Sequence, residues 1–221
     1  MISSFDSLPL LLAGDPGARD VILRLVDRQE SETQEREVSL IAGMTDKPFC
    51  LAAVVLDDWN RQLSPWEAPP VFGREGFGSG AGETLELIIS KVLPKLDQDL
   101  KRRFFLCGYS LAGLFALWSA YRTDVFAGVA AVSPSVWFDA WTDHASGLHI
   151  RAPRVYLSLG DREKLSKNPR MARVEDCIRF QDALLERDSA CVEHTLKFNP
   201  GGHFNDPPLR CALGAAWLLE R

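Results

Sequence analysis

The stretch that decides the fold is Arg103-Phe104-Phe105-Leu106-Cys107-Gly108-Tyr109-Ser110-Leu111-Ala112-Gly113. Its apolar start predicts a short buried strand, and apolar residues at helical spacing follow Ser110 as far as Tyr121. A serine between a strand and a helix, with small residues two positions away on both sides (Gly108 and Ala112), is typical of a nucleophile elbow. Such a turn holds the hydroxyl out from a sheet. We therefore interpret Ser110 as a nucleophile that attacks a carbonyl group.

A nucleophilic serine needs a base, and His203 is the best placed of the histidines. It lies in a loop rich in glycine and proline, residues 199–208, between the last strand pattern and the last helix pattern. His194 instead belongs to an alternating strand pattern, and His144 and His149 lie in a polar stretch. We therefore expect His203 to accept the proton of Ser110.

The acid that orients the base should follow the strand predicted at residues 155–159. Two carboxylates compete in the next segment, Gly160-Asp161-Arg162-Glu163. Glu163 is favoured because its offset from Gly160 leaves the chain room to turn toward the histidine, and glutamate serves in some triads. Asp161 is the alternative, although it lies close enough to the strand end to cap the turn.

Strands and helices alternate along the chain. Strands are expected at residues 20–26, 49–56, 103–107, 126–132, 155–159 and 191–198, and helices at 32–44, 83–96, 111–121, 172–186 and 209–219. Near-continuous apolar strands separated by helices predict an α/β fold, with a mainly parallel sheet and helices on both faces. The proposed nucleophile, acid and base each follow a strand end, so they should meet at the carboxyl edge of the sheet.

The N-terminal part predicts a minimal core. No antiparallel hairpin and no inserted lid is evident before Asp20, so we expect an open site. The helix at 32–44 begins with Ser31-Glu32-Thr33-Gln34, which has the form of a capping box. Its first half is charged and polar, so we expect it to project into solvent.

Two more features at the same sheet edge bear on the reaction. The N–H of Leu111, at the start of a helix, is free to hold an oxyanion, and a second N–H should come from Asp27 or Arg28 after the first strand. A long loop at residues 57–74 contains Trp59 and Trp66, and Trp137 lies in a later loop. These tryptophans are candidates for lining the substrate pocket, while the long loop could equally pack on its own aromatic residues.

Composition restricts the class of protein. The chain has 221 residues, enough for one domain with a sizeable core, so residues 1–221 are expected to form a single domain. A net charge of −5 without a Lys/Arg cluster argues against a nucleic-acid partner. Five scattered cysteines predict reduced thiols, and the first apolar run is too short for a signal peptide or membrane span, so we expect a cytoplasmic protein without a membrane partner. No cofactor and no metal is expected. The sequence does not decide whether the protein forms a homodimer.

Two segments carry a family resemblance: Gly108-Tyr109-Ser110-Leu111-Ala112-Gly113-Leu114-Phe115-Ala116-Leu117 and Phe126-Ala127-Gly128-Val129-Ala130-Ala131-Val132-Ser133-Pro134-Ser135-Val136-Trp137-Phe138. Together they resemble an esterase family of the α/β-hydrolase superfamily that includes the esterase D type and the enterobactin-type siderophore esterases. The resemblance is close over residues 103–141 and looser beyond. It implies an α/β-hydrolase fold, Ser110 as nucleophile, His203 as base and an acid in the loop after Gly160. The short N-terminal part and the lack of a basic pocket argue against a large anionic siderophore as substrate.

The sequence thus predicts a serine esterase that cleaves a small carboxylic ester or thioester by two-step acyl transfer on Ser110. An acyltransferase or thioesterase would use the same three residues and differ only in the acceptor or leaving group. A non-catalytic binding protein with the same fold is the alternative outside enzymes.

Overall fold

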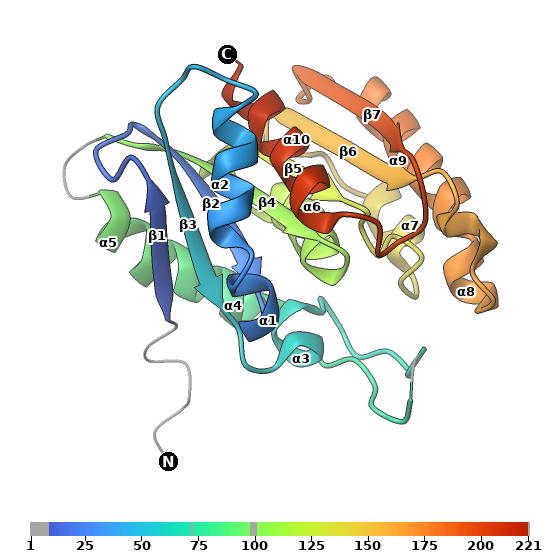
Figure 1. Cartoon of the computed structure of the whole chain (residues 1–221). Helices are drawn as coiled ribbons and strands as arrows, with labels where there is room; N and C mark the ends of the chain where they lie inside the picture. The colour runs from blue at the N-terminus through green and yellow to red at the C-terminus, as the bar shows by residue number, and fades with distance from the viewer. Residues whose placement is uncertain (1–8, 72, 98–100, 221) are drawn as a thin grey trace.

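A seven-stranded sheet forms the centre of the protein (Figure 1). The computed structural model describes residues 9–71, 73–97 and 101–220. The strands, in the spatial order β1-β3-β2-β4-β5-β6-β7, are β1 Leu10–Gly14, β2 Asp20–Val26, β3 Phe49–Val55, β4 Arg103–Tyr109, β5 Phe126–Val132, β6 Arg154–Gly160 and β7 Glu193–Asn199. Every neighbouring pair is parallel except β1 with β3. The predicted mainly parallel sheet is confirmed.

Helices cover both faces of the sheet, as the sequence predicted. The longer helices are α2 Gln34–Ala42, α4 Ala81–Leu87, α6 Leu111–Arg122, α9 Val174–Arg187 and α10 Pro207–Leu219. The shorter ones are α1 Arg28–Ser31, α3 Trp59–Leu63, α5 Leu93–Asp97, α7 Trp141–Ser146, α8 Pro169–Ala172, the 3₁₀ turn η2 Glu163–Leu165 and the π-helical η1 Ile88–Val92, which joins α4 to α5. Helices α2 and α10 pack together on one face, and α6 packs against β4 and β5 on the other. None of the helices in the described part of the chain combines the length and apolar content that a membrane span requires.

One strand before Asp20, β1, was not predicted from the sequence, although it forms no hairpin with β2. Strand β1 runs antiparallel to β3, with Leu10 opposite Val54 and Gly14 opposite Cys50. It is an edge strand, and its residues are only partly buried. The residues of β1 do not alternate between apolar and polar side chains, and the proline before them argues against a strand, although an edge strand tolerates it. The sequence pattern therefore did not predict β1.

The helix predicted at 32–44 is α2, which is shorter than predicted and follows the separate short helix α1, and the capping box does not form. Thr33 precedes α2 without a side-chain capping bond, and its hydroxyl donates instead to the carbonyl of Glu30 at 2.8 Å. The polar first half also does not simply project into solvent. Glu37 is buried, and its carboxylate lies 2.9 Å from Nε of Arg24 on β2. A buried charge that has a partner on the sheet cannot be recognised from the helix sequence alone.

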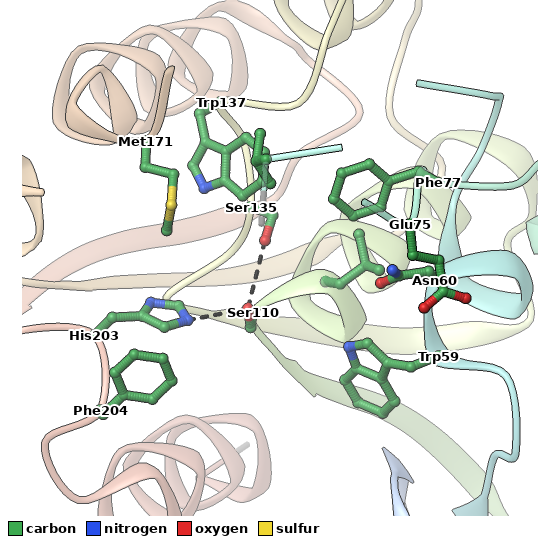
Figure 2. Close-up of a pocket in the computed structure, with 12 residues that line it drawn as sticks. Trp59, Asn60, Glu75, Phe77, Ser110, Ser135, Trp137, Met171, His203 and Phe204 are labelled. Carbon is green, nitrogen blue, oxygen red and sulfur yellow. Dashed lines mark hydrogen bonds between the residues drawn. The ribbon is translucent and has the colours of Figure 1, made fainter. Parts of the chain in front are cut away.

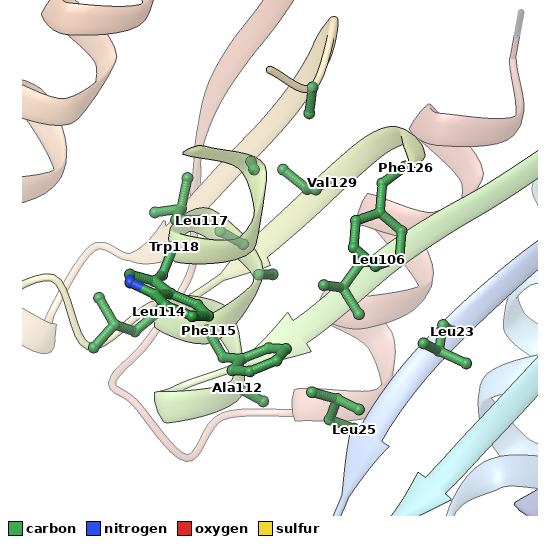
Figure 3. Packing of buried hydrophobic residues seen from close by; sticks show 14 of the residues in the cluster. Leu23, Leu25, Leu106, Ala112, Leu114, Phe115, Leu117, Trp118, Phe126 and Val129 are labelled. Atoms are coloured by element: carbon green, nitrogen blue, oxygen red, sulfur yellow. The ribbon is translucent and has the colours of Figure 1, made fainter. Parts of the chain in front are cut away.

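The main hydrophobic cluster holds the elbow helix against the sheet (Figure 3). Helix α6 is buried along almost its whole length, from Leu111 to Tyr121. Figure 3 shows Phe115 packed near Leu25 of β2 and Leu106 of β4. Burying such side chains contributes about 1.5–3 kcal/mol each, so the start of α6 is rigidly placed relative to the ends of the strands.

Candidate active site

Ser110 occupies a strained turn between β4 and α6. Its backbone has φ 57° and ψ −118°, a region that non-glycine residues rarely adopt and that costs about 1–3 kcal/mol. The turn is fixed by hydrogen bonds: the Ser110 N–H donates to the carbonyl of Val132 at 3.0 Å, and the Ser110 carbonyl accepts from Leu114 N–H at 3.0 Å. Gly108 is required, because a Cβ there would lie 2.0 Å from the carbonyl oxygen of Ala112. This is the geometry of a nucleophile elbow.

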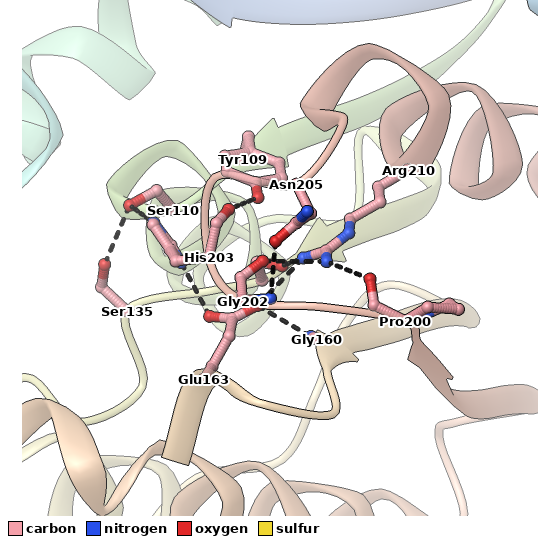
Figure 4. A network of polar contacts seen from close by, with 11 residues as sticks. Tyr109, Ser110, Ser135, Gly160, Glu163, Pro200, Gly202, His203, Asn205 and Arg210 are labelled. Atoms are coloured by element: carbon pink, nitrogen blue, oxygen red, sulfur yellow. Dashed lines mark hydrogen bonds and ion pairs between the residues drawn. The ribbon is translucent and has the colours of Figure 1, made fainter. Parts of the chain in front are cut away.

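The three residues singled out in the sequence form one hydrogen-bonded chain (Figure 4). Nε2 of His203 lies 3.0 Å from Oγ of Ser110, and Nδ1 of His203 lies 2.7 Å from Oε2 of Glu163. The three come from the elbow, from the loop between β7 and α10, and from the turn η2 after β6. The side chain of Glu163 is 4% exposed and that of His203 is 17% exposed, so the acid and the base are largely shielded from water.

The second oxygen of Glu163 is held by two donors. Oε1 accepts from the Gly160 N–H at 2.7 Å and from Nη1 of Arg210 at 3.1 Å. Burial alone would raise the pKa of this carboxyl. The hydrogen bond and charge of His203, together with the Gly160 N–H, outweigh burial and leave the pKa of Glu163 below its ordinary value. Glu163 is therefore ionised at neutral pH and able to orient His203.

Asp161, the alternative acid, has a different task. It is exposed, and its Oδ1 accepts the Gly201 N–H at 2.8 Å. The N–H of Arg162 in turn donates to the Gly201 carbonyl at 3.1 Å. Asp161 thus ties the acid loop to the histidine loop, while Glu163 faces the imidazole.

Arg210 is a site residue that the sequence interpretation missed. This buried guanidinium on α10 donates to Glu163, to Oγ of Ser133 and to the carbonyls of Pro200 and Gly202 at 2.9–3.1 Å. It therefore joins the acid, the segment after β5 and the histidine loop. A charged residue within the otherwise apolar pattern of residues 209–219 was the available signal.

Tyr109 adds a further support to the histidine loop. Its hydroxyl donates to the carbonyl of His203. Burial raises the pKa of Tyr109 to about 12, so the phenol keeps its proton. The residue directly before the nucleophile thus holds the backbone of the base.

Ser135 is a second hydroxyl beside the nucleophile. Its N–H donates to the carbonyl of Ser110 at 3.0 Å, and its Oγ lies 3.5 Å from Oγ of Ser110. Ser135 is buried and sits in the segment that follows β5, where Ser133 has a positive φ of 44°. The segment that carries the family resemblance therefore supports the elbow directly.

A cavity of about 230 Å³ opens above Ser110 (Figure 2). Its lining includes Trp59, Asn60, Phe77, Leu111, Trp137 and Phe204. Two of the three tryptophans predicted to line a pocket, Trp59 and Trp137, do so. A second cavity of about 270 Å³ adjoins it on the other side of His203.

Trp66 is not among the lining residues, so that expectation is wrong. Its Nε1 donates to the carbonyl of Asp139 at 2.9 Å, and its ring centroid lies 4.9 Å from that of His144 and 5.9 Å from that of Phe138. Trp66 fastens the long loop to the segment after β5. The loop therefore does both things considered for it: Trp59 lines the cavity, and Trp66 packs the loop down.

The predicted oxyanion donors lie in two places, the start of α6 and the turn after β2. Leu111 lines the cavity as the first residue of α6, where a backbone N–H has no acceptor within the helix. Asp27 caps α1, accepting the Glu30 N–H at 2.7 Å, and Arg28 pairs with Asp57 on the surface at 3.1 Å. Neither residue lines the cavity with its side chain. A backbone N–H from this turn as second donor stays a prediction.

Within residues 9–71, 73–97 and 101–220, no group of three or more His, Cys, Asp or Glu side chains is arranged to hold a metal ion.

The fold matches those of solved serine hydrolases, while no protein-family model and no curated protein matches the chain. Siderophore hydrolase EstA from Aspergillus nidulans superposes with a TM-score of 0.70 at 18% identity, over 92% of this chain and 83% of that one. An IroE-like serine hydrolase from Shewanella oneidensis gives 0.74 at 16% identity, over 94% and 74%. Siderophore hydrolase EstB from Aspergillus nidulans gives 0.72 at 15% identity, over 96% and 90%. The likeness establishes the α/β-hydrolase fold.

Proposed function

We propose that the protein is a serine esterase that hydrolyses a small carboxylic ester through an acyl-enzyme on Ser110. The observation that carries the proposal is the chain of hydrogen bonds from Ser110 through His203 to Glu163, at 3.0 and 2.7 Å, on an elbow that opens into a cavity. Nucleophile, base and orienting acid in this order are the parts that acyl transfer requires. With all three in contact, a purely non-catalytic role has less support.

In the first step, Oγ of Ser110 attacks the ester carbonyl while its proton passes to Nε2 of His203. A bond forms between Oγ and the carbonyl carbon, and the carbonyl oxygen becomes an oxyanion that the Leu111 N–H can hold. The tetrahedral intermediate then breaks its bond to the alcohol oxygen. That oxygen leaves with the proton from His203, which restores the neutral imidazole.

In the second step, water releases the acyl group. His203 takes a proton from water as the oxygen attacks the acyl carbonyl, and the bond to Ser110 breaks with return of the proton to Oγ. The products are a carboxylic acid and the regenerated serine. Glu163 keeps its charge throughout and stabilises the imidazolium in both steps.

The proposed substrate is compact and carries no multiple negative charge. EstA and EstB are siderophore hydrolases, and this chain shares their fold at 18% and 15% identity. Among the described residues that line the cavity above Ser110 there is no Lys or Arg. A polyanionic catecholate would find no cationic side chain there. We therefore propose ester hydrolysis for this protein, as in EstA and EstB, with a substrate other than a siderophore. Activity against p-nitrophenyl esters of increasing acyl length tests the proposal.

The location we propose is a reducing compartment, the cytoplasm. All five cysteines are free thiols, and Cys50, Cys107, Cys177 and Cys211 are buried. Cysteines in such a compartment are usually reduced and form no disulfides.

Exchanging the two acids in turn should separate their roles. Glu163→Gln should lower kcat about 10³- to 10⁴-fold, because the neutral amide no longer stabilises the imidazolium. Asp161→Asn should stay within about threefold of wild type, because the amide oxygen can still accept the Gly201 N–H. Steady-state kinetics on p-nitrophenyl acetate measures both. Full activity in Glu163→Gln with loss in Asp161→Asn would reverse the assignment.

Removing the hydroxyl of Ser135 should have a smaller effect. Ser135→Ala should lower kcat about three- to tenfold with little change in KM, because its 3.5 Å contact with Oγ of Ser110 is weak and the Ser135 N–H is retained. Ser135→Thr, which keeps a hydroxyl, is the matched comparison. If Ser135→Ala lowers kcat by more than about 10³-fold, the hydroxyl takes part in the reaction and does more than position Ser110.

A further inference from the structure

The cavity above Ser110 has a polar side that the hydrolytic steps do not use. Glu75 and Asn60 line it together with the rings of Trp59 and Phe77. In Figure 2 these four residues lie on the side of Ser110 away from His203 and Phe204. A carboxylate and aromatic rings on the same side of a cavity are a combination that attracts an ammonium group.

The charges around Glu75 leave its carboxylate available to a ligand. Glu75 is exposed, and within the described part of the chain it forms no ion pair. It is the one carboxylate, and His203 the one basic side chain, among the described residues that line this cavity. Arg162 lines the neighbouring cavity, and the side chain of Arg61 lies 3.4 Å from Glu83. Although Arg74 precedes Glu75 in the chain, it does not line the cavity, so the carboxylate among the described lining residues lies on the side away from the base.

The position of His203 decides which half of an ester meets Glu75. The alcohol oxygen takes its proton from Nε2 of His203, so the alcohol must leave on the histidine side. The acyl chain then extends the other way, toward Trp59, Phe77 and Glu75.

We propose that the enzyme prefers esters whose acyl group carries an ammonium cation, bound by Glu75 and the rings of Trp59 and Phe77. The inference rests on the proposed esterase function and names its substrate class. An exposed ion pair and an exposed cation–π contact are each worth a few-fold, so the preference should be about tenfold in kcat/KM. It should shrink as salt is added, because the pair is screened.

The test compares two p-nitrophenyl esters of equal shape. One has a γ-trimethylammoniobutyryl group, and in the other carbon replaces the nitrogen, which removes the charge and keeps the volume. Each kcat/KM is divided by the rate of hydroxide-catalysed hydrolysis of the same ester, because the cation also activates the carbonyl. The measured quantity is the ratio between the two corrected values.

The ratio should be about ten for the wild type at low salt. It should fall to about two or three in Glu75→Gln and below one in Glu75→Lys. Glu67→Gln is the matched control, since Glu67 is exposed on the same loop and outside the cavity lining, and its ratio should equal that of the wild type.

Two results would overturn the inference: a corrected ratio near one in the wild type, or a ratio that Glu75→Gln leaves unchanged. Hydrolysis of both esters at equal corrected rates rejects the cation site and leaves the esterase function standing. Hydrolysis of neither ester, under conditions where the protein is folded, rejects the esterase function itself and the inference with it.

Discussion

Replacing Ser110 with alanine should lower kcat for ester hydrolysis by about 10⁵- to 10⁶-fold, the loss typical of removing the nucleophile of a serine hydrolase. Alanine lacks the oxygen that forms the acyl-enzyme, and water would have to attack the ester directly from the same site. The residual rate should come from oxyanion binding alone. Steady-state and single-turnover kinetics on p-nitrophenyl acetate measure the effect.

The fold should survive this substitution. Alanine at position 110 meets the same φ of 57° as serine, and it loses only the hydrogen bond to His203 and the 3.5 Å contact with Oγ of Ser135. Ser146→Ala is the matched control, because Ser146 is an exposed serine on α7 whose hydroxyl donates to the Thr142 carbonyl. It should keep full activity. A Ser110→Ala protein that is folded and retains more than about a tenth of the wild-type kcat would remove Ser110 from the mechanism.

Gly108→Ala should have the largest effect on stability, lowering the free energy of unfolding by more than about 4 kcal/mol. The added Cβ would lie 2.0 Å from the carbonyl oxygen and 2.3 Å from the carbonyl carbon of Ala112. Both are backbone atoms of α6, which is buried along its length and cannot move away without breaking its packing. Urea denaturation, followed by circular dichroism, measures the loss.

Gly82→Ala is the control for this prediction. Gly82 lies in α4, and a Cβ there meets nothing within 4 Å. Alanine favours a helix over glycine by up to about 1 kcal/mol, so this variant should be as stable as the wild type or slightly more so. If the free energy of unfolding of Gly108→Ala lies within about 1 kcal/mol of the wild-type value, β4 and α6 do not meet as closely as described.

Features that depend on neighbouring residues, or on the order of elements along the chain, were predictable from the sequence. Ser110 sits on a strand–turn–helix pattern that also explains the requirement for Gly108. Glu163 stands at an offset from Gly160 at which the turn η2 directs its side chain back to the strand end. His203 was identified by its position in the chain, after the last strand, because parallel strands bring such loops to one edge.

Features that depend on distant partners were not predictable. Arg210 lies 47 residues from Glu163 in the chain, and only the packing of α10 over the sheet brings the two together. Trp66 and Trp59 looked equivalent as candidates, yet the carbonyl of Asp139 holds the first away from the cavity. Strand β1 is stabilised by the backbone of β3 rather than by burial of its own side chains.

The proposed reaction requires one reactive hydroxyl, and labelling with a fluorophosphonate tests this requirement directly. The reagent phosphonylates a serine only when a base activates it, so intact-mass and peptide mass spectrometry should find one adduct per chain, on Ser110. Loss of activity should follow the extent of labelling, and Ser110→Ala should stay unlabelled. Folded wild-type protein that takes no label, or a label that persists in Ser110→Ala, would contradict the assignment of Ser110 as the nucleophile.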